Sequence, residues 1–394
     1  MALILGLESS CDDSAVALVN GDRQILAQAV VGQNDAHRPF GGVVPEIAAR
    51  AHVEILPGLI RQVLAEADVS IGQVDAIAAT AGPGLIGGVM VALLAGKGLS
   101  IASGKPLLAI NHLEGHALSP RLVDRDLGFP YLLLLASGGH CQLLEVRGVG
   151  DYRRLATTID DAAGEAFDKA AKLLGLGYPG GPAIEALARD GDPRAVKLPR
   201  PLVGSGEPHF SFAGLKGAVQ REVASGKHLP ADVAASFQQA VIDCMIDRTR
   251  VAIAATDSAT LVVAGGVAAN GPLRAALADL AASEGRGFSV PPTWLCTDNA
   301  AMIAWAGAER YALGLIDGLD APARARWPLD ETADKVRGAG AKARAYRNWP
   351  SLAAGRGAPR WPRSQRLAIA KPCCGRSKMT SWRQSTRSTR IRSI

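Results

Sequence analysis

Apolar runs of strand length recur along the chain, and the first two belong to a layout that occurs twice. Residues 2–7 form an apolar run that the polar cluster 8–14 interrupts before it resumes over residues 15–19. This pattern predicts a β-hairpin with an acidic turn. Residues 131–146 repeat the strand, polar turn and strand. Two copies of one hairpin predict two similarly built α/β lobes that face each other across a cleft.

Helical spacing of apolar residues predicts most of the remaining elements. Pro57 is expected to kink or divide the first long helix. The predicted helices cover residues 45–68, a segment ending at 100, 110–119, 159–176, 229–256, a segment starting at 273, and a segment ending at 313 after the N-cap sequence 297–300. Buried strands are predicted at residues 74–80 and 261–264, and the Pro-rich span 190–210 is predicted to be a loop.

His112 and His116 are the first candidates for chemistry. In a helix from Ile110 that stops before Pro120, their spacing places both imidazoles on one face, where they can close on one metal ion. The alternative is one solvated and one core histidine on an amphipathic helix. In the zinc-peptidase motif the glutamate stands beside the first histidine. Here Glu114 comes two positions later, which disfavours peptidase chemistry.

A third ligand is needed for such a metal site, and Asp298 is the candidate. It lies at a predicted strand-to-helix junction, and a carboxylate completes a two-histidine site for iron or zinc with positions left open for substrate. The alternative is that Asp298 only caps the following helix.

Paired glycines follow two predicted strands, in residues 137–140 and 265–270. Such turns let backbone amides approach a phosphate or a ring, and Asn270 can hydrogen-bond a base or a sugar. Each turn alone is also compatible with a simple tight turn, but the pair favours nucleotide binding in the cleft. Residues 82–87 match a dinucleotide-binding glycine pattern without its later acid, and Gly96-Lys97 lacks the Ser or Thr of a P-loop.

Charge is distributed unevenly over the 394 residues. Residues 346–394 contain 12 Lys and Arg and no Asp or Glu, which leaves 31 basic against 37 acidic side chains in residues 1–345. The tail is interpreted either as a nucleic-acid-binding arm or as a non-native, disordered extension. Residues 1–345 contain four scattered cysteines. These cysteines, the lack of a basic leader and the lack of an apolar run of membrane-spanning length predict a cytoplasmic protein.

Several motifs, in chain order, resemble the bacterial tRNA adenosine threonylcarbamoyltransferase family. They are residues 5–13, 41–46, 82–85, 111–116, 137–140, 160–176 with 178–181, 210–216, 265–270 and Asp298. The resemblance runs from residue 2 to residue 345. It implies an α/β fold of the actin, Hsp70 and sugar-kinase (ASKHA) type, with two duplicated ribonuclease-H-like lobes. The expected lobes are 1–128 plus 296–345, which carries the metal ligands, and 129–295 on the nucleotide side.

The same resemblance implies a reaction. The threonylcarbamoyl group of threonylcarbamoyl-AMP would pass to the exocyclic amine of the adenosine adjacent to the tRNA anticodon, with release of AMP. The implied partners are tRNA, a homologous inactive paralogue (TsaB-like) and an ATPase (TsaE-like). Other activities considered are an ATP-binding or ATPase module of a multiprotein assembly and, with less support, a metallopeptidase.

The resemblance also implies roles for individual residues. His112, His116 and Asp298 would hold one Fe2+ per subunit, or Zn2+. Asp12 is the candidate for orienting the amine or taking its proton. The residues implied to bind the donor are Ala136, Ser137, Gly138, Gly139 and His140 at its phosphate and carbamoyl part, and Asp168, Gly181, Glu185 and Asn270 around its nucleoside.

Overall fold

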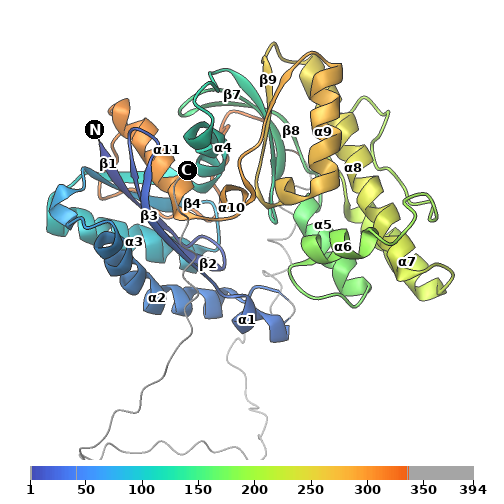
Figure 1. Cartoon of the computed structure of the whole chain (residues 1–394), viewed down its shortest axis with the longest axis horizontal. Coiled ribbons are helices and arrows are strands. Elements are labelled where there is room, and N and C mark those ends of the chain that lie inside the picture. Colours follow the sequence, from blue (N-terminus) through green and yellow to red (C-terminus); the bar gives the residue numbers. More distant parts are fainter. Residues whose placement is uncertain (1, 41, 335, 337–394) are drawn as a thin grey trace, which may run out of the picture. The chain divides into compact units, whose positions relative to one another are not determined.

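The computed structural model describes residues 2–40, 42–334 and 336 (Figure 1). The expected properties of residues 346–394 lie outside this part of the chain. A five-stranded sheet comes first, in the order β3-β2-β1-β4-β5. Its strands are β1 (Leu3–Glu8), β2 (Asp13–Asn20), β3 (Ile25–Gly32), β4 (Ala76–Gly82) and β5 (Leu107–Asn111). β1 pairs antiparallel with β2 and parallel with β4.

A second five-stranded sheet has the order β10-β9-β6-β7-β8. Its strands are β6 (Tyr131–Ala136), β7 (Cys141–Gly148), β8 (Asp151–Thr157), β9 (Thr260–Ala264) and β10 (Gly287–Ser289). β6 pairs antiparallel with β7 and parallel with β9, as β1 does with β2 and β4. The two sheets therefore share one topology, and the prediction of two similarly built α/β lobes is confirmed.

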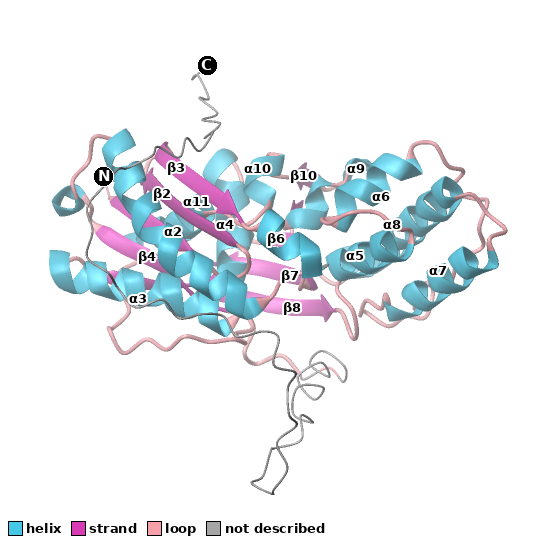
Figure 2. Cartoon of the chain, turned by 90° about the horizontal axis from the view of Figure 1, so that it is seen from below, coloured by secondary structure: helices cyan, strands magenta, loops and turns pink. Residues whose placement is uncertain are grey.

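Helices cover both faces of the first sheet (Figure 2). The helices of the described chain are α1 (Asn34–His37), α2 (Pro45–Glu66), α3 (Ile86–Ser103), α4 (His112–Val123), α5 (Ala163–Leu173), α6 (Gly180–Ala188), α7 (Ala213–Ser225), α8 (Pro230–Ala254), α9 (Gly271–Ser283), α10 (Thr293–Cys296) and α11 (Ala300–Ala312), with short 3-10 helices at Arg38–Phe40, Ile71–Gln73 and Gly266–Ala269. Leu5 and Leu7 of β1 pack in a cluster with α2 and α3, whereas Ile4 packs with α4 and α11. Both faces are buried, which explains the near-continuous apolar runs of these strands.

Helix α11 follows the second sheet in the chain but packs on the first. Ala301, Ile303 and Ala304 are fully buried against β1, β2 and β4. α4 packs beside α11 on the same face of the first sheet and also joins the two lobes, because its Leu113 and Ala117 pack in one cluster with β6 and β9. The chain thus returns to its first lobe just after residue 298, and this return brings distant residues together.

Three helix predictions are wrong in detail. α4 begins at His112, because Ile110 and Asn111 belong to β5 and to the helix N-cap, and it continues through Pro120 to Val123. Pro120 has no N–H for the carbonyl of His116, and Ser119 Oγ donates to that oxygen at 3.0 Å instead. α2 is one continuous helix that contains Pro57, so only the alternative in which Pro57 divides the helix is wrong. α5 covers only residues 163–173 of the predicted 159–176.

Helix α3 is, among the described helices, long and apolar enough to cross a membrane by length and composition alone. The prediction that no run reaches that length is therefore wrong. Such a helix is weak support for a membrane span, because core helices meet the same criterion. α3 packs on β4 and α2, and its Lys97 donates to the carbonyl of Ala321 at 2.7 Å.

Candidate functional site

The two histidines of α4 stand at the end of a buried strand. β5 is buried along its whole length, and Asn111 caps α4 because its side chain accepts from Leu113 N at 2.9 Å. His112 and His116 therefore occupy the first two turns, with ring centroids 4.8 Å apart in an edge-on arrangement. Both rings are buried, and their i to i+4 spacing places them on one face of the helix.

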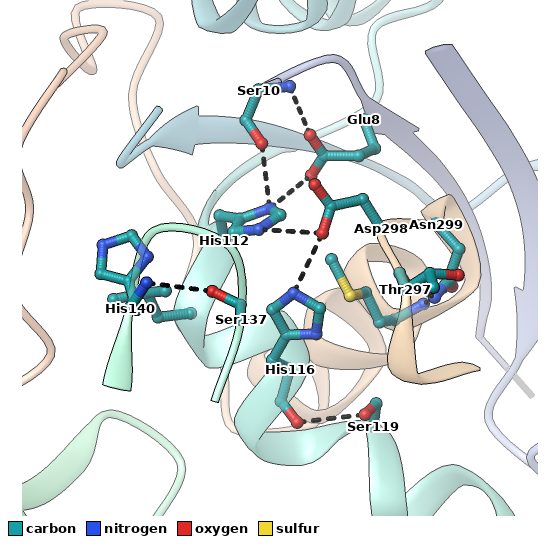
Figure 3. A network of polar contacts seen from close by, with 12 residues as sticks. Glu8, Ser10, His112, His116, Ser119, Ser137, His140, Thr297, Asp298 and Asn299 are labelled. Atoms are coloured by element: carbon teal, nitrogen blue, oxygen red, sulfur yellow. Dashed lines mark hydrogen bonds and ion pairs between the residues drawn. The ribbon is translucent and has the colours of Figure 1, made fainter. Parts of the chain in front are cut away.

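Asp298 meets both histidines from the segment before α11 (Figure 3). Its Oδ1 lies 3.4 Å from His112 Nε2 and 3.2 Å from His116 Nε2. Asn299, not Asp298, caps α11, since its side chain accepts from Met302 N at 2.9 Å. The interpretation of Asp298 as only a helix cap is therefore wrong. A quarter of the Asp298 side chain is exposed, so the trio is open on one side.

The separations of Asp298 Oδ1 from the two imidazole nitrogens, 3.4 and 3.2 Å, fit a single metal ion. Ligands about 2.1 Å from one ion lie about 3.0–3.4 Å from each other in octahedral or tetrahedral arrangements. One ligand atom from each of His112, His116 and Asp298 lies within 4.8 Å of the others. Two imidazole nitrogens and one carboxylate suit iron or zinc and leave positions for substrate.

The carboxylates around the trio also favour binding of a cation. Burial lowers the pKa of His112, but the Asp298 and Glu8 carboxylates outweigh burial and hold the net pKa well above its usual range. Burial raises the pKa of Asp298, while His112 and His116 bring it well below its usual value. The carboxylates thus stabilise positive charge at the imidazoles, which either protons or a metal ion can supply.

The turn after β6 lies beside this trio. Ser137 N donates to His140 O at 2.7 Å, and His140 N donates to Ser137 Oγ at 3.2 Å, which closes the turn and leaves Gly138 and Gly139 exposed. Burial lowers the pKa of His140 to about 4, and His112 and His116 contribute to this shift. His140 is therefore neutral at pH 7. Ala136 is the buried last residue of β6.

The residues implied to surround a nucleoside form two groups in the second lobe. Asp168 Oδ1 accepts from Gly180 N at 2.8 Å, next to Gly181 at the start of α6, where a side chain would meet no atom within 4 Å. Asn270 Nδ2 donates to Glu185 Oε2 at 3.2 Å and to Gln238 Oε1 at 2.9 Å. Burial is the main reason why the pKa of Asp168 is raised.

Asp12 lies in the acidic turn between β1 and β2, outside the histidine and aspartate trio. The neighbouring Asp13 has a pKa raised to about 7, first by burial and then by Asp298, Asp12 and Glu8. Asp12 also contributes to the raised pKa values of Tyr178 and Asp168, both of which shift mainly through burial. The acidic turn, which belongs to the first lobe, therefore lies close enough to the second lobe to raise the pKa of Asp168 and Tyr178.

Comparison with known proteins decides the family. Residues 24–305 match the family model described as TsaD, tRNA N6-adenosine threonylcarbamoyltransferase. A protein of that name from Sphingopyxis alaskensis is 71% identical, and the alignment covers 87% of this chain and 100% of that protein. Another of the same name, from Novosphingobium aromaticivorans, is 67% identical with the same coverage of both chains.

This chain belongs to the TsaD family.

The crystal structure of T. kodakarensis HypF is similar to this chain in fold, with a TM-score of 0.54 at 15% identity over 80% of this chain and 48% of that one. A phosphate- and nucleotide-bound full-length HypF has a TM-score of 0.51 at 14% identity, covering 79% of this chain and 46% of that one. With the duplicated sheets, these similarities confirm the ASKHA-type α/β fold of this TsaD family member.

Glu8 is a site residue of this TsaD family member that the sequence interpretation missed. It is fully buried at the end of β1, and its Oε2 lies 3.0 Å from His112 Nδ1. Because His112 Nδ1–H donates to this carboxylate, Nε2 keeps its lone pair for a metal. Thr80 Oγ1 and Ser10 N also donate to Glu8, each at 2.5 Å. The indication in the sequence was an acidic residue directly after the apolar run of residues 2–7.

Gly84, just before α3, and Gly88, in its first turn, have a different role from phosphate binding. A side chain at Gly84 would lie 2.5 Å from Ser10 O, and one at Gly88 would lie 2.2 Å from Ser9 O. Leu85 N, at the start of α3, donates to Ser10 O at 2.8 Å. These glycines therefore let α3 pack directly against the turn that follows Glu8, and that turn already occupies the Leu85 amide.

Glu114 faces away from the histidine pair. It is buried and accepts from Gly150 N at 3.1 Å, Tyr152 O–H at 3.0 Å and Arg310 Nη1 at 3.2 Å. A glutamate fully engaged in this way does not reach a water at the histidines. The structure thus supports the prediction that peptidase chemistry is disfavoured, in agreement with TsaD membership.

Proposed function

We propose that this chain transfers the threonylcarbamoyl group from threonylcarbamoyl-AMP to the exocyclic amine of the adenosine adjacent to the tRNA anticodon. The nitrogen would attack the carbamoyl carbon, the bond from that carbon to the AMP phosphate oxygen would break, and the amine would lose one proton. The convergence of His112, His116 and Asp298 beside the Ser137–His140 turn carries the proposal, in a chain of the TsaD family.

His112, His116 and Asp298 would hold the metal, which we propose to be Fe2+, with Zn2+ as the alternative. When bound, the metal supplies a Lewis acid for the carbonyl of the threonylcarbamoyl group. Glu8 fixes His112 with Nδ1 protonated, and neutral His140 adds no positive charge that would compete with the metal.

The turn Ala136–His140 would bind the phosphate and carbamoyl part of the donor. Gly138 and Gly139 carry no side chains, so their amides can approach an anion closely. Asp168 and Gly181, and the hydrogen-bonded pair Glu185 and Asn270, would surround the nucleoside. The Nδ2 group of Asn270 already donates to Glu185 and Gln238, which supports a role for Asn270 in shaping this surface.

Asp12 would orient the attacking amine or take its proton. AMP is a good leaving group, so the reaction does not require a strong base at this position. We further assign residues 1–128 plus 296–345 to the lobe that carries the metal ligands and residues 129–295 to the nucleotide lobe. The packing of α11 on β1 supports this assignment.

The proposed partners are tRNA, a TsaB-like inactive paralogue and a TsaE-like ATPase, in the cytoplasm. Four of the cysteines, Cys11, Cys141, Cys244 and Cys296, are free thiols among the described residues, which is consistent with a reducing compartment.

Transfer of radiolabelled threonine to tRNA tests the function. The full chain with metal and its partner proteins should form labelled, threonylcarbamoylated adenosine, and a His116→Ala variant should lose this activity. A His228→Ala variant changes a partly exposed histidine on the nucleotide lobe and serves as the matched control. Absence of labelled adenosine, despite bound metal and intact partners, would contradict the proposal.

A further inference from the structure

A chain of hydrogen bonds runs from the segment before α2 to the acidic turn, buried along its middle and partly buried at its two ends. Its members are Gln33, His37 of α1 and His52 of α2, and we refer to these three residues as the relay. His37 and His52 are fully buried and Gln33 exposes 5% of its surface. Water therefore has little access to the bonds between these three side chains.

The proton positions in the relay follow from its two ends. Val44 N can only donate, so His37 Nδ1 accepts from it at 3.3 Å and Nε2 carries the proton. His37 Nε2 then donates to Gln33 Oε1 at 3.3 Å. At the other end Cys11 O can only accept, so His52 Nε2 donates to it at 3.1 Å and Nδ1 accepts.

Gln33 satisfies both ends at once. With Oε1 directed at His37, its Nε2 donates to His52 Nδ1 at 3.2 Å and to the carbonyl of Ala48 at 3.5 Å. Ser14 Oγ donates to the same His52 nitrogen at 2.7 Å. The proton positions assigned from Val44 and those assigned from Cys11 thus require the same orientation of the Gln33 amide. In that orientation every donor in the relay meets an acceptor.

The far end of the relay is the backbone of the acidic turn. Cys11 precedes Asp12 directly and follows Glu8, the partner of His112, by three residues. We propose that Gln33, His37 and His52 are positioning residues that hold the acidic turn, and with it Asp12, in place for acyl transfer. This inference rests on the proposed function for its catalytic consequence, but the geometry of the relay does not.

Burial favours the neutral form of His52. Burial lowers the pKa of His52 and nearby His37 adds to this, whereas the Cys11 carbonyl, Glu8 and Asp12 oppose it. A second proton on His37 would set an N–H against the N–H of Val44. The relay therefore requires both imidazoles in the neutral form with the proton on Nε2.

Nitrogen-15 NMR of histidine-labelled protein tests the geometry without any activity. His37 and His52 should both show the Nε2–H tautomer at pH 7. His52 should become protonated only at a pH lower than the ordinary histidine pKa of about 6.5. An Nδ1–H tautomer at either residue, or ordinary titration of His52, would overturn the relay. This measurement decides the geometry even if the wild-type protein transfers no threonylcarbamoyl group, a result that would contradict the proposed function alone.

Substitution of Gln33 tests the catalytic consequence in the full chain with metal and partners. Gln33→Met should lower kcat about 10- to 100-fold and leave metal content unchanged, while the exposed Gln62→Met on α2 is the matched control. Gln33→Glu should regain activity as pH falls, because a protonated carboxyl supplies the donor that His52 Nδ1 needs. A Gln33→Met variant with the kcat of the wild type would overturn the positioning role of the relay. So would a Gln33→Glu variant whose activity depends on pH in the same way as that of the wild type. If Gln33→Met fails to fold, the Gln33→Glu profile still decides.

Discussion

Glu8 orients His112, a proposed metal ligand, without itself facing the open side of the site. A Glu8→Gln substitution keeps the shape but removes the charge that fixes the His112 proton on Nδ1. We expect metal affinity to fall about 10- to 100-fold, measured by competition with a chromophoric chelator. Glu46→Gln, at an exposed position in the first turn of α2, should leave the affinity unchanged. Equal affinities in both variants would contradict the role of Glu8.

The pH dependence of metal binding follows from the same charges. Asp298 and Glu8 raise the pKa of His112 in the metal-free protein despite burial, so a proton competes with the metal at higher pH than for an ordinary histidine. As pH falls, we expect metal affinity to weaken about tenfold per pH unit for each proton that the metal displaces. Because the pKa of His112 is raised, this weakening should begin at a pH above the ordinary histidine value of about 6.5. Titrations between pH 6 and 9 measure this. A flat affinity over that range would show that no proton leaves His112.

The metal-free protein should show the opposite trend in stability. A raised pKa means that the folded state binds the His112 proton more tightly than the unfolded state. The resulting stability is fully present below the unfolded pKa and is lost as pH rises through the folded pKa. Thermal unfolding in the presence of a chelator should therefore occur at lower temperature as pH increases through that range, and an unchanged or rising unfolding temperature would contradict this prediction.

Residue-level prediction worked where the signal was local. His112 and His116 are four positions apart, so their shared face followed from helical geometry. Asp298 was only a candidate on spacing, because nothing local shows that residues 182 positions apart in sequence meet; the ordered family resemblance selected it. Glu8 was missed since its contact with His112 depends on β1 and β5 lying in one sheet with β4 between them.

At the scale of elements, Asn299 links helix α11 to the site. Its side chain accepts from Met302 N and donates to Thr297 O at 2.7 Å, and the residue is 2% exposed. Asn299→Ala should lower the free energy of unfolding by about 1–2 kcal/mol and weaken metal binding, because it loosens the neighbouring Asp298. Urea unfolding measures the first effect. Asn34→Ala, at the exposed start of α1, is the control, and equal stabilities would contradict the cap.

Strands were easier to predict than helix ends. The strands of both hairpins are buried on both faces, so their apolar runs are long and end at polar turns. The start of α4 was wrong because Ile110 is apolar in either a strand or a helix. Its end was wrong because Ser119 replaces the hydrogen bond that Pro120 cannot make, and a side-chain substitution of this kind has no signature in apolar spacing.

At the scale of the whole molecule, charge raises the question of how tRNA is bound. Residues 1–345 carry more acidic than basic side chains, while tRNA binding requires positive surface. We expect local Lys and Arg clusters or the partner proteins to provide it, so a chain trimmed to residue 345 should keep its tRNA affinity in a filter-binding assay. Loss of binding on trimming would give the basic tail a role, and intact mass of the natively expressed protein would show whether the tail is present.

The return of α11 to the first sheet has a consequence for synthesis on the ribosome. β1 to β5 are complete by residue 111, yet one face of their sheet packs against Ala301, Ile303 and Ala304. Until those residues emerge, the first lobe exposes apolar surface and lacks Asp298. The second lobe, whose strands and helices α5 to α9 end by residue 289, can bury its own core earlier. The lobe that is translated first therefore finishes folding last, and His112, His116 and Asp298 come together only at that final step.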